Sequence, residues 1–549
     1  MHRLKWLSLL LLLIVAGCTA GFTEVVEQEI PVAELKAHET IDIPFHAAID
    51  EATITDERVL LIRDDGTQVA RTVTVSEDGM TLHIAPPTEG FAAGNYTLTI
   101  MPNVLTITGQ PLVASDYTKK YTVPIRYRVE QFIDGQVQVV GMFNTKEEAQ
   151  AAMTDNTVLF DYDTAIAIPN GQGLVITSRD GITKLYSDEA LTSSKTYVGA
   201  GSELRFLEKT ATAIKVLTVN EVFYIQPSNE TYVPFYAERT HYTVEHGQLL
   251  MHVRHYRRHD TSTFAVADAP SFLAEGQRYY SDDGYTFYTE GGDSVGHAPP
   301  YFQFLSMRST TSYSAQQLDD YIVNMLQQRE ASGGQYTNAA TTSKLLGLGT
   351  VLKKVEQEMH INALFILALA QHESDYGMSN HAQTYNNLFG LYVFDSNPAN
   401  KQFASIEANV YELAAQFLNK NYIPPTAGYA HGAYFGNKGQ GVNVRYASDQ
   451  FWGVKAAGHA YRIDRALGGQ DIHRFDVLQV NDEIFNAQNR LPVYAAPQKG
   501  AELLYTIPTA HKQFVSAYRE QPDAGWIAIV SDSGKYDKGY IEAKFITAK

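Results

Sequence analysis

Alternating apolar and polar residues dominate the first half of the chain, and a helical pattern replaces them near residue 301. Between residues 37 and 125, runs such as "RVLLIRDDGTQVARTVTV" are separated by turn signals such as "EDG" and "AAGN". Short alternating strands with turns at this spacing are typical of a β-sandwich. We therefore predict a sandwich over 37–125, preceded by a tether over 18–36.

The strand pattern continues over residues 126–235, and a similar pattern returns over residues 488–549. Within the second stretch, Trp526–Ile529 and Gly539–Ile541 have the sequence of two closing strands. The part "TKLYSDEALTSSKTYVGAGSELRFLE" of the first stretch and the second stretch resemble bacterial SH3-like barrels, whereas 37–125, with its "GNYTLTI" segment, resembles bacterial Ig-like domains. The SH3-like resemblance implies modules that hold a wall polymer, or alternatively spacer barrels without a ligand.

Tyrosines are concentrated in residues 236–300, which contain the segment "YYSDDGYTFYT". The turn signal at Asp282–Asp283–Gly284 predicts a β-hairpin. Aromatic faces of this kind either stack on sugars or cover a neighbouring domain, and the sequence favours the second interpretation.

Helical periodicity and helix-start signals mark residues 301–475 as a separate domain. Ser314, with Gln317 three residues later, forms a capping-box pattern, and Asn362 and Ser405 are expected to cap two further helices. Every residue from Ala363 to Ala370 is apolar. A helix that is apolar on all sides is buried in a core.

Composition and charge narrow the classes of function. The 549 residues carry a formal net charge of −18. This charge argues against a nucleic-acid partner, because phosphate binding needs clustered Lys and Arg. Residues 1–17 combine a short basic region with an apolar stretch, as a secretory signal does. No later segment reaches the roughly 18 apolar residues of a membrane span, so no second span is expected.

The chain has a single cysteine, Cys18, at the position where such a signal is cut. The surrounding "VAGC" resembles the lipobox of bacterial lipoproteins. This resemblance implies that Cys18 is lipid-modified and holds the protein on the outer face of the cell membrane, with a chance cysteine as the alternative. A secreted chain with one cysteine has no disulfide pair, so its domains depend on packing.

Glu373 is the candidate acid, because it follows directly on the apolar helix. Burial and the negative end of a helix both favour the protonated form of a carboxyl group. Such an acid can protonate the leaving oxygen of a glycosidic bond, although it can also simply close a core helix. The zinc motif H-E-x-x-H is incomplete, because Tyr376 occupies the place of its second histidine. We expect no metal and no organic cofactor.

Four segments then occur in a fixed order: "NALFILALAQHESDYGMSNHA", "NNLFGLYVFDSNP", "GAYFGNKGQGVNVRYASDQFWG" and "AYRIDRALGGQD". Over about 301–475 the chain resembles the bacterial β-N-acetylglucosaminidases of glycoside hydrolase family 73. The resemblance implies a helical, lysozyme-like catalytic domain that cleaves peptidoglycan glycan strands after N-acetylglucosamine in the cell wall. The fold class expected for the whole chain is therefore multidomain α+β, with an Ig-like sandwich, two SH3-like barrels and this helical domain.

The resemblance also implies roles for individual residues. Glu373 corresponds to the family's catalytic acid, and Tyr446, in "YASD", to the tyrosine that supports the reacting sugar. A second carboxylate is expected at Asp395, with Glu407 as the weaker candidate because a helix N-terminus already explains an acid there. A third route needs no second carboxylate, because the acetamido oxygen of the substrate acts as the nucleophile.

Further residues are predicted to contact the substrate. These are Asn387, Phe389, Tyr392, Asn443, Asp449 and Trp452, with Tyr434, Phe435 and Phe451 as additional aromatic candidates. Each aromatic is alternatively a core residue, and Asn387 with Phe389 alternatively forms a structural turn. Two rival functions remain: a muramidase or lytic transglycosylase, and a wall-binding scaffold without catalysis.

Overall fold

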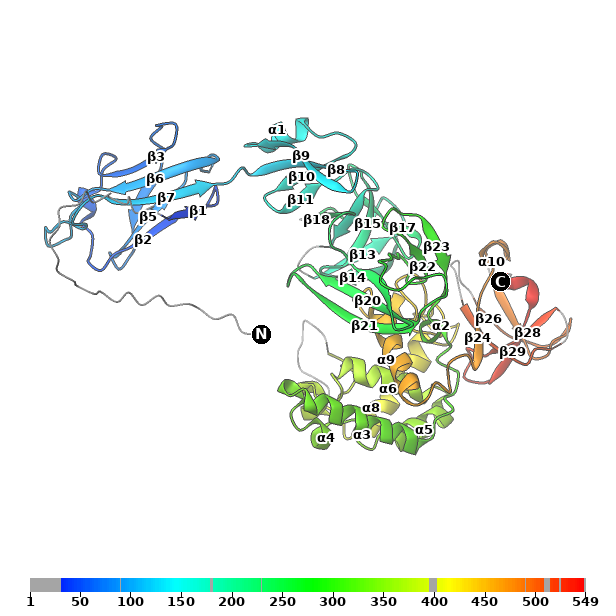
Figure 1. Ribbon diagram of the computed structural model, residues 1–549. Coiled ribbons are helices and arrows are strands. Elements are labelled where there is room, and N and C mark those ends of the chain that lie inside the picture. Colours follow the sequence, from blue (N-terminus) through cyan, green and yellow to red (C-terminus); the bar gives the residue numbers. More distant parts are fainter. Residues whose placement is uncertain are drawn as a thin grey trace, which may run out of the picture. The chain divides into compact units, whose positions relative to one another are not determined.

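The computed structural model of the protein (Figure 1) describes residues 31–88, 90–177, 181–228, 230–393, 402–488, 490–507, 514–522 and 525–547. Chain contacts divide it into two compact units, one containing residues up to Tyr127 with Met142–Glu148, and one containing Arg128–Gly141 and everything from Ala149 onward. The predicted signal, Cys18 and Asp395 lie outside the described residues.

The first unit is a sandwich of two sheets. Leu61 and Leu98 of one sheet and Ile43 and Ile84 of the other are at most 2% exposed and share one core. The strands, in sheet order, are β1 (Val32–Glu34), β7 (Tyr117–Val123), β6 (Gly94–Ile100) and β3 (Val59–Arg63), then β2 (Ile41–Pro44), β5 (Thr81–Ala85) and β4 (Thr72–Val75), with a 3-10 turn at Glu51–Thr53.

The first strand corrects the predicted boundary of the tether. β1 lies within the residues assigned to the tether, 18–36, and pairs in parallel with β7, Val32 opposite Lys120. The alternation of apolar residues did not reveal this strand, because it has three residues and only one of them is partly buried. The sandwich therefore starts earlier than the alternation of apolar residues indicates.

An eleven-stranded sheet follows over the region predicted to be β-rich, and most of its residues belong to the second unit. Val175, Leu204, Val216 and Phe223 are fully buried in its core. In sheet order the strands are β14 (Ser194–Gly199), β13 (Ile182–Tyr186), β17 (Glu221–Ile225), β16 (Ile214–Thr218), β15 (Glu203–Lys209), β12 (Gly173–Ile176), β18 (Thr231–Pro234), β11 (Thr164–Ala167), β10 (Thr157–Asp161), β8 (Tyr127–Ile133) and β9 (Gln136–Phe143), with one helix, α1 (Lys146–Ala151).

The tyrosine-rich region forms two small sheets and covers its neighbours. Tyr279, Tyr280 and Tyr285 are at most 7% exposed, and Tyr285 makes edge contacts with Phe304 and Phe514. These tyrosines therefore follow the second of the two interpretations, packing on a neighbouring domain. The strands are β19 (His241–Glu245), β20 (Gln248–His255), β21 (Asp260–Asp268), β22 (Thr286–Tyr288) and β23 (Ser294–His297).

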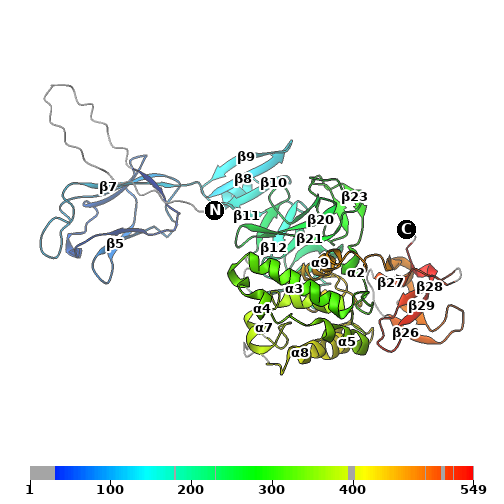
Figure 2. The same ribbon diagram turned by 60° about the horizontal axis from the view of Figure 1, so that its bottom comes forward.

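A helical domain follows, and its helix α6 lies at the centre. Every residue from Ala363 to Ala370 has no exposed surface. α6 packs against α5 and α9, and α3, α5 and α8 lie side by side on the face turned forward in Figure 2. The helices are α2 (Tyr301–Phe304), α3 (Ala315–Ala331), α4 (Ala339–Thr342), α5 (Gly349–Met359), α6 (Ala363–Glu373), α7 (Asn380–Tyr385), α8 (Ile406–Glu412) and α9 (Trp452–Ala466), with 3-10 turns at Gly334–Tyr336 and Val442–Val444.

The predicted helix starts are confirmed. Ser314 and Gln317 form a reciprocal capping box, and the side chain of Asn362 accepts the N–H of Leu364 at 2.9 Å. Ser405 caps α8 through the N–H of Ala408 at 3.1 Å. Each cap depends only on residues within one turn, so the local sequence was sufficient to predict it.

The helix that Ser405 caps changes form after α8. From Leu413 to Tyr422 the chain is a π-helix, η3, with Leu413, Leu418 and Tyr422 buried. Buried positions four to five residues apart suit the wider turn of a π-helix, which often occurs near functional sites. This change directs the ring of Tyr422 toward Tyr446, with 5.3 Å between their centroids.

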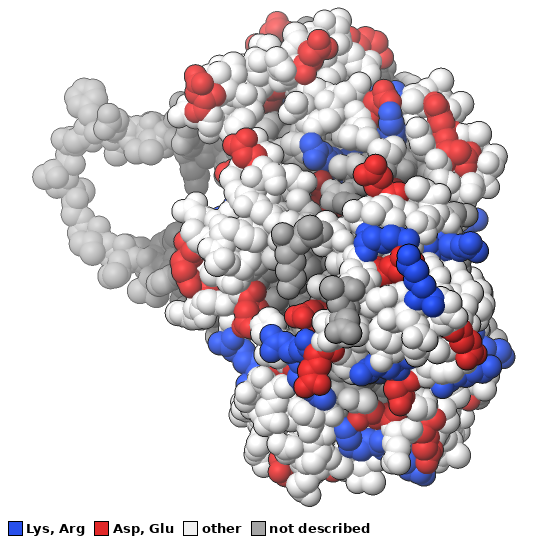
Figure 3. Space-filling view, turned by 90° about the vertical axis from the view of Figure 1, so that its right-hand side faces the viewer, with Lys and Arg blue, Asp and Glu red and all other residues white. Residues whose placement is uncertain are grey.

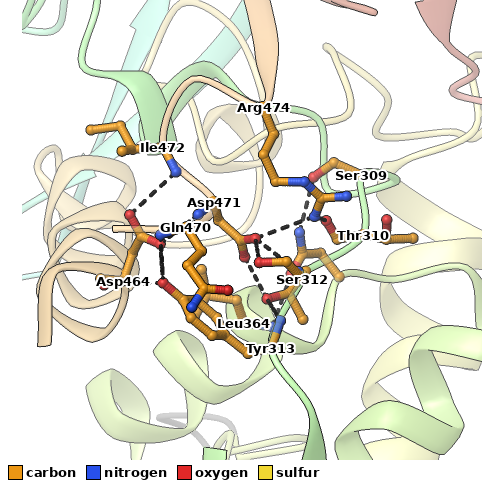
Figure 4. Close-up of polar contacts among 12 residues, drawn as sticks. Ser309, Thr310, Ser312, Tyr313, Leu364, Asp464, Gln470, Asp471, Ile472 and Arg474 are labelled. Carbon is orange, nitrogen blue, oxygen red and sulfur yellow. Dashed lines mark hydrogen bonds and ion pairs between the residues drawn. The ribbon is translucent and has the colours of Figure 1, made fainter. Parts of the chain in front are cut away.

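Two buried acids fix the end of α9 (Figure 4). Asp464 accepts hydrogen bonds from the Tyr313 hydroxyl at 2.6 Å and from the N–H of Asp471 at 2.8 Å. Its second oxygen accepts the N–H of Ile472 at 3.2 Å. Asp471 in turn accepts the hydroxyl of Ser312 at 2.6 Å. α9 is thus tied to the segment before α3 at its far end from Trp452.

Replacing Asp464 with alanine should lower the free energy of unfolding by about 2–4 kcal/mol, because three buried donors lose their acceptor. Chemical denaturation followed by circular dichroism measures the change. Asp320→Ala, at an exposed acid on α3, is the matched control and should change stability by less than about 0.5 kcal/mol. Equal stability of the two variants would contradict the structural role of Asp464.

The C-terminal module is a six-stranded sheet that starts earlier than predicted. β24 pairs with β27, Phe475 opposite Tyr518, so the module begins at Phe475 and not at residue 488. The two predicted closing strands pair directly, Ile529 opposite Gly539. In sheet order the strands are β24 (Phe475–Gln479), β27 (Phe514–Tyr518), β28 (Trp526–Val530), β29 (Lys538–Glu542), β25 (Leu491–Tyr494) and β26 (Leu503–Ile507), with α10 (Asp482–Gln488) and a 3-10 turn at Ala543–Phe545.

This module is attached to the helical domain through specific contacts. The N–H of Ser306 donates to Ser516 Oγ at 2.8 Å, and the N–H of Phe514 donates to the hydroxyl of Tyr434 at 3.3 Å.

On the face shown in Figure 3, acidic and basic side chains are interspersed. No helix within the described ranges combines the length and hydrophobicity needed to cross a bilayer.

Candidate active site

The predicted acid, Glu373, is the last residue of the buried helix α6. The chain then turns sharply, because Asp375, Tyr376 and Gly377 all have positive φ angles of 49°, 58° and 77°. Non-glycine residues rarely adopt this conformation, and such strain is found where a structure must place a side chain accurately. The turn ends α6 at Glu373 and leaves the carboxyl group partly exposed at the edge of the core.

The surroundings of Glu373 favour its protonated form. Burial raises the pKa of this carboxyl group to about 7, and the negative charge of Asp449 acts in the same direction. The indole N–H of Trp452 donates to Glu373 Oε1 at 2.6 Å. This hydrogen bond stabilises the carboxylate and therefore lowers the pKa of Glu373. A group with this pKa can both donate and accept a proton near neutral pH.

Four aromatic rings form a row that starts at this acid. The ring of Trp452 lies 4.7 Å from Tyr446, Tyr446 lies 5.3 Å from Tyr422, and Tyr422 lies 5.6 Å from Tyr429. The two ends of the row differ in exposure, since Trp452 is 3% exposed and Tyr429 is 50% exposed. The row therefore runs from the partly exposed acid to an exposed ring, and flat rings of this kind suit the apolar faces of sugars.

Tyr446 is a neutral hydroxyl group beside the acid. Burial raises its pKa well above 10, and the charge of Glu373 adds to this effect. The phenol consequently keeps its proton at neutral pH. It can donate a hydrogen bond to charge that develops on a substrate.

Close backbone packing positions the start of α9, where Trp452 lies. A side chain at Gly453 would bring its Cβ to 2.0 Å from the carbonyl oxygen of Gly436. Only glycine allows this approach, which seats the first turn of α9 on the preceding loop. Asp449 accepts the N–H of Phe451 at 2.8 Å and pairs with Lys455 at 2.5 Å.

Several residues predicted to contact the substrate have internal partners. Asn387 is 1% exposed, and its amide accepts the N–H of Leu391 at 3.0 Å and donates to the Leu391 carbonyl at 2.9 Å. Phe389 is 4% exposed in the same core. This placement corresponds to the alternative of a structural turn, because no polar group of Asn387 is directed outward.

Asn443 is fully buried and donates to the carbonyls of Asp449 and Gln450 at 3.4 and 3.3 Å. The carboxylate of Asp449 is likewise engaged by Lys455. Both residues shape the loop around Tyr446. Tyr392 is partly exposed, and its hydroxyl donates to Glu412 of α8 at 2.5 Å.

The remaining aromatic candidates differ in exposure. Tyr434 and Phe435 are at most 2% exposed, whereas Phe451 is partly buried against the tyrosine-rich sheets. Of the two candidates for a second carboxylate, Asp395 lies outside the described residues. Glu407 lies in the first turn of α8, exposed, with Lys354 3.3 Å away.

Sequence reasoning missed Tyr422, Tyr429 and the buried Lys438. Lys438 Nζ donates to the carbonyls of Asn443 and Ala447, both at 2.8 Å, and burial lowers its pKa to about 7. No motif marks these residues, since their role comes from segments that meet only in the folded chain. Within the described part of the chain, no three His, Cys, Asp or Glu side chains gather closely enough to hold a metal ion.

Replacing Trp452 with phenylalanine should shift the basic limb of the pH–activity profile upward by about half a unit. The substitution removes a donor that stabilises the ionised Glu373, so the acid keeps its proton to higher pH. Initial rates measured between pH 5 and 9 test this. Trp526→Phe, in the C-terminal module, is the control that should leave the profile in place, and an unshifted Trp452→Phe profile would contradict the assignment.

A carboxyl group with a pKa near 7, a neutral tyrosine and a row of rings together form the kind of site that glycoside hydrolases use. Comparison with known families points to the same class. Residues 349–465 match the protein-family model for glucosaminidases, described as mannosyl-glycoprotein endo-beta-N-acetylglucosaminidase. The matched range contains Glu373, Tyr446 and Trp452.

Two Streptococcus pneumoniae proteins, each named "Putative endo-beta-N-acetylglucosaminidase", are 30% identical to this chain over 246 residues, or 44% of its length. The alignment covers 32% and 30% of those proteins, so the chain spans about a third of the length of these curated relatives. A solved structure of a catalytic mutant of S. aureus autolysin E with the disaccharide NAG-NAM is 16% identical, with a TM-score of 0.23, over 31% of this chain and 75% of that chain.

Proposed function

We propose that this protein is a peptidoglycan hydrolase that cleaves the β-1,4 glycosidic bond after N-acetylglucosamine and leaves this sugar at the new reducing end. The observation that carries the proposal is Glu373, an acid with a pKa near 7 held by Trp452 beside Tyr446. The glucosaminidase match over 349–465 supports the choice of sugar. Glu373 acts as general acid and protonates the leaving oxygen.

The second group in the reaction distinguishes three routes. A carboxylate about 5 Å from Glu373 would act as a nucleophile, whereas one about 6.5–9.5 Å away would activate water. In the third route the 2-acetamido oxygen of the substrate attacks, and Tyr446 supports the developing charge. Asp395→Asn separates the routes, since it removes activity in the first two and preserves it in the third.

Product analysis tests the proposed function. Purified peptidoglycan is digested with the full chain and reduced, and the new end sugars are identified by mass spectrometry. N-acetylglucosaminitol ends are expected from the wild type. Muramitol or anhydro-muramic ends would instead identify a muramidase or a lytic transglycosylase. Binding to the wall without any new ends would identify a scaffold.

The remaining modules are proposed to place this reaction at the cell surface. Lipidation at Cys18 would anchor the chain on the outer face of the membrane, because each buried CH₂ of a lipid chain contributes about 0.8 kcal/mol. The N-terminal sandwich, as an Ig-like spacer, and the two SH3-like modules would carry the helical domain into the wall. Replacing Cys18 with serine should move the protein from the membrane fraction to the soluble fraction of cell extracts.

A further inference from the structure

The β-module at residues 173–234 contacts the loop that carries Tyr446. We infer that this module is part of the catalytic apparatus, with Thr196 and Tyr197 of β14 as positioning residues for Tyr446. The inference rests on the proposed function and adds to it a role for a module that would otherwise be a spacer or a wall-binding domain. Neither residue contacts the acid; both act on the backbone of the loop.

Two side-chain hydroxyls hold the residues immediately before Tyr446. Thr196 Oγ1 donates to the carbonyl of Val444 at 2.6 Å, and the Tyr197 hydroxyl donates to the carbonyl of Arg445 at 3.0 Å. Thr196 has no exposed surface, so the carbonyl of Val444 has no water to replace this donor. Losing a buried hydrogen bond of this kind leaves an unsatisfied acceptor that the loop can relieve only by moving.

Contacts from the same module hold the loop on the other side of Tyr446. The N–H of Gly199 donates to the carbonyl of Ser448 at 2.7 Å. The N–H of Glu203, at the start of β15, donates to the Gln450 side chain at 2.7 Å. In return, Arg445 donates to the carbonyl of Ser194 at 3.3 Å. Tyr446 therefore lies in the middle of a segment fixed at both ends by one module.

The loop depends on these contacts because it belongs to no helix or strand between Val444 and Trp452. Inside the helical domain, Lys438 supplies hydrogen bonds to the carbonyls of Asn443 and Ala447. The ring of Tyr197 covers Lys438, with Nζ 4.9 Å from the ring centroid. The module thus forms hydrogen bonds to the loop directly, and it also covers Lys438, which forms hydrogen bonds to the loop from inside the helical domain.

Displacement of the loop would act on catalysis through Tyr446 and Trp452, whose rings lie 4.7 Å apart. Trp452 donates to Glu373, so a shift of the indole would change the positions of the acid and the phenol relative to each other. A shift of about 1 Å in such an arrangement can lower kcat by about 100-fold. Substrate affinity depends on more of the surface, so KM should change much less.

The test compares Thr196→Val with Tyr197→Phe and with the double variant. Each substitution removes a hydroxyl and preserves the shape of the side chain. Thr183→Val and Tyr186→Phe are the matched controls on β13, since neither hydroxyl has a hydrogen-bond partner among the described residues. On soluble glycan strands, the double variant should lose about tenfold or more in kcat with KM within about twofold. Thr196→Ser, which keeps the hydroxyl, should retain the wild-type kcat.

A second measurement needs no substrate. In a Trp6→Phe/Trp526→Phe background, Trp452 is the only indole, and its fluorescence is quenched weakly while it remains 3% exposed. The double variant should increase acrylamide quenching, whereas both controls should leave it unchanged. Tyr197→Phe alone, which removes one atom from a partly exposed side chain, gives the same readout if the double variant folds poorly.

Failure of the positioning role and failure of the proposed function give different experimental results. An active wild type with unchanged kcat and unchanged quenching in the double variant would overturn the positioning role and leave the proposed function standing. A wild type that releases no N-acetylglucosamine ends would overturn the proposed function, and the quenching result would then decide alone whether β14 holds the loop. Equal loss of kcat in the controls would also overturn the inference.

Discussion

Replacing Glu373 with glutamine should lower kcat/KM on peptidoglycan by about 10²- to 10⁴-fold, the contribution usual for a general acid. Glutamine preserves the shape of the side chain but has no proton to give to a leaving oxygen. The wild-type rate should fall as pH rises through about 7, because the pKa of Glu373 lies there and the ionised form cannot protonate. Reducing-end release measured from pH 5 to 9 tests both expectations.

Stability measurements separate loss of the acid from loss of the fold. The pKa of Glu373 in the folded chain lies above its ordinary value of 4.5, so folded protein binds the proton more tightly than unfolded protein does. The contribution of Glu373 to the free energy of unfolding is therefore fully present below pH 4.5. It is lost as the pH rises to about 7, where Glu373 ionises in the folded protein. Glu373→Gln should accordingly be more stable than the wild type at pH 8, by about 1–3 kcal/mol, and equal to it at pH 4.

Glu407→Gln is the matched control for this substitution. Glu407 is an exposed acid at the start of α8, paired with Lys354, and its replacement should leave activity unchanged. Wild-type activity in Glu373→Gln, or a comparable loss in both variants, would contradict the assignment of Glu373 as the acid.

Replacing Tyr446 with phenylalanine should lower kcat by about 10²-fold, as is usual when a donor to developing charge is removed. The substitution preserves the ring that contacts Trp452 and Tyr422 and removes only the hydroxyl. KM should change less than kcat, because this hydrogen bond is strongest in the transition state. Steady-state kinetics on soluble glycan strands measure both constants.

Tyr411→Phe is the control, since Tyr411 lies on α8 and its hydroxyl donates to Glu358 of α5 in an exposed hydrogen bond. A Tyr446→Phe enzyme with normal kcat would show that the phenol only packs against Trp452. A rise in KM at constant kcat would place the hydroxyl in ground-state binding of the sugar instead.

Local sequence was enough to predict features that depend on neighbouring residues. The caps at Ser314, Asn362 and Ser405 and the buried helix before Glu373 follow from patterns within one or two turns. The same reasoning placed β1 in a tether, because a strand of three residues with little burial has no alternating pattern.

Features that depend on distant residues were beyond sequence reasoning. Trp452 was predicted to be a sugar platform, yet it is 3% exposed and donates to an acid 79 residues earlier. The hydroxyls of Thr196 and Tyr197 lie 248 residues from the carbonyls that they bond. Nothing in the spacing of either pair indicates contact, because each depends on how whole elements pack.

The burial of α6 has a consequence for how this protein should lose activity on heating. Amide groups of a helix with no exposed surface exchange with solvent only when the surrounding domain opens as a whole. Glu373 is attached to the last turn of that helix, so partial fraying elsewhere should leave the acid in place. Thermal inactivation and cooperative unfolding of the helical domain should therefore occur together, and the amides of Leu364–Ala370 should be among the slowest to exchange.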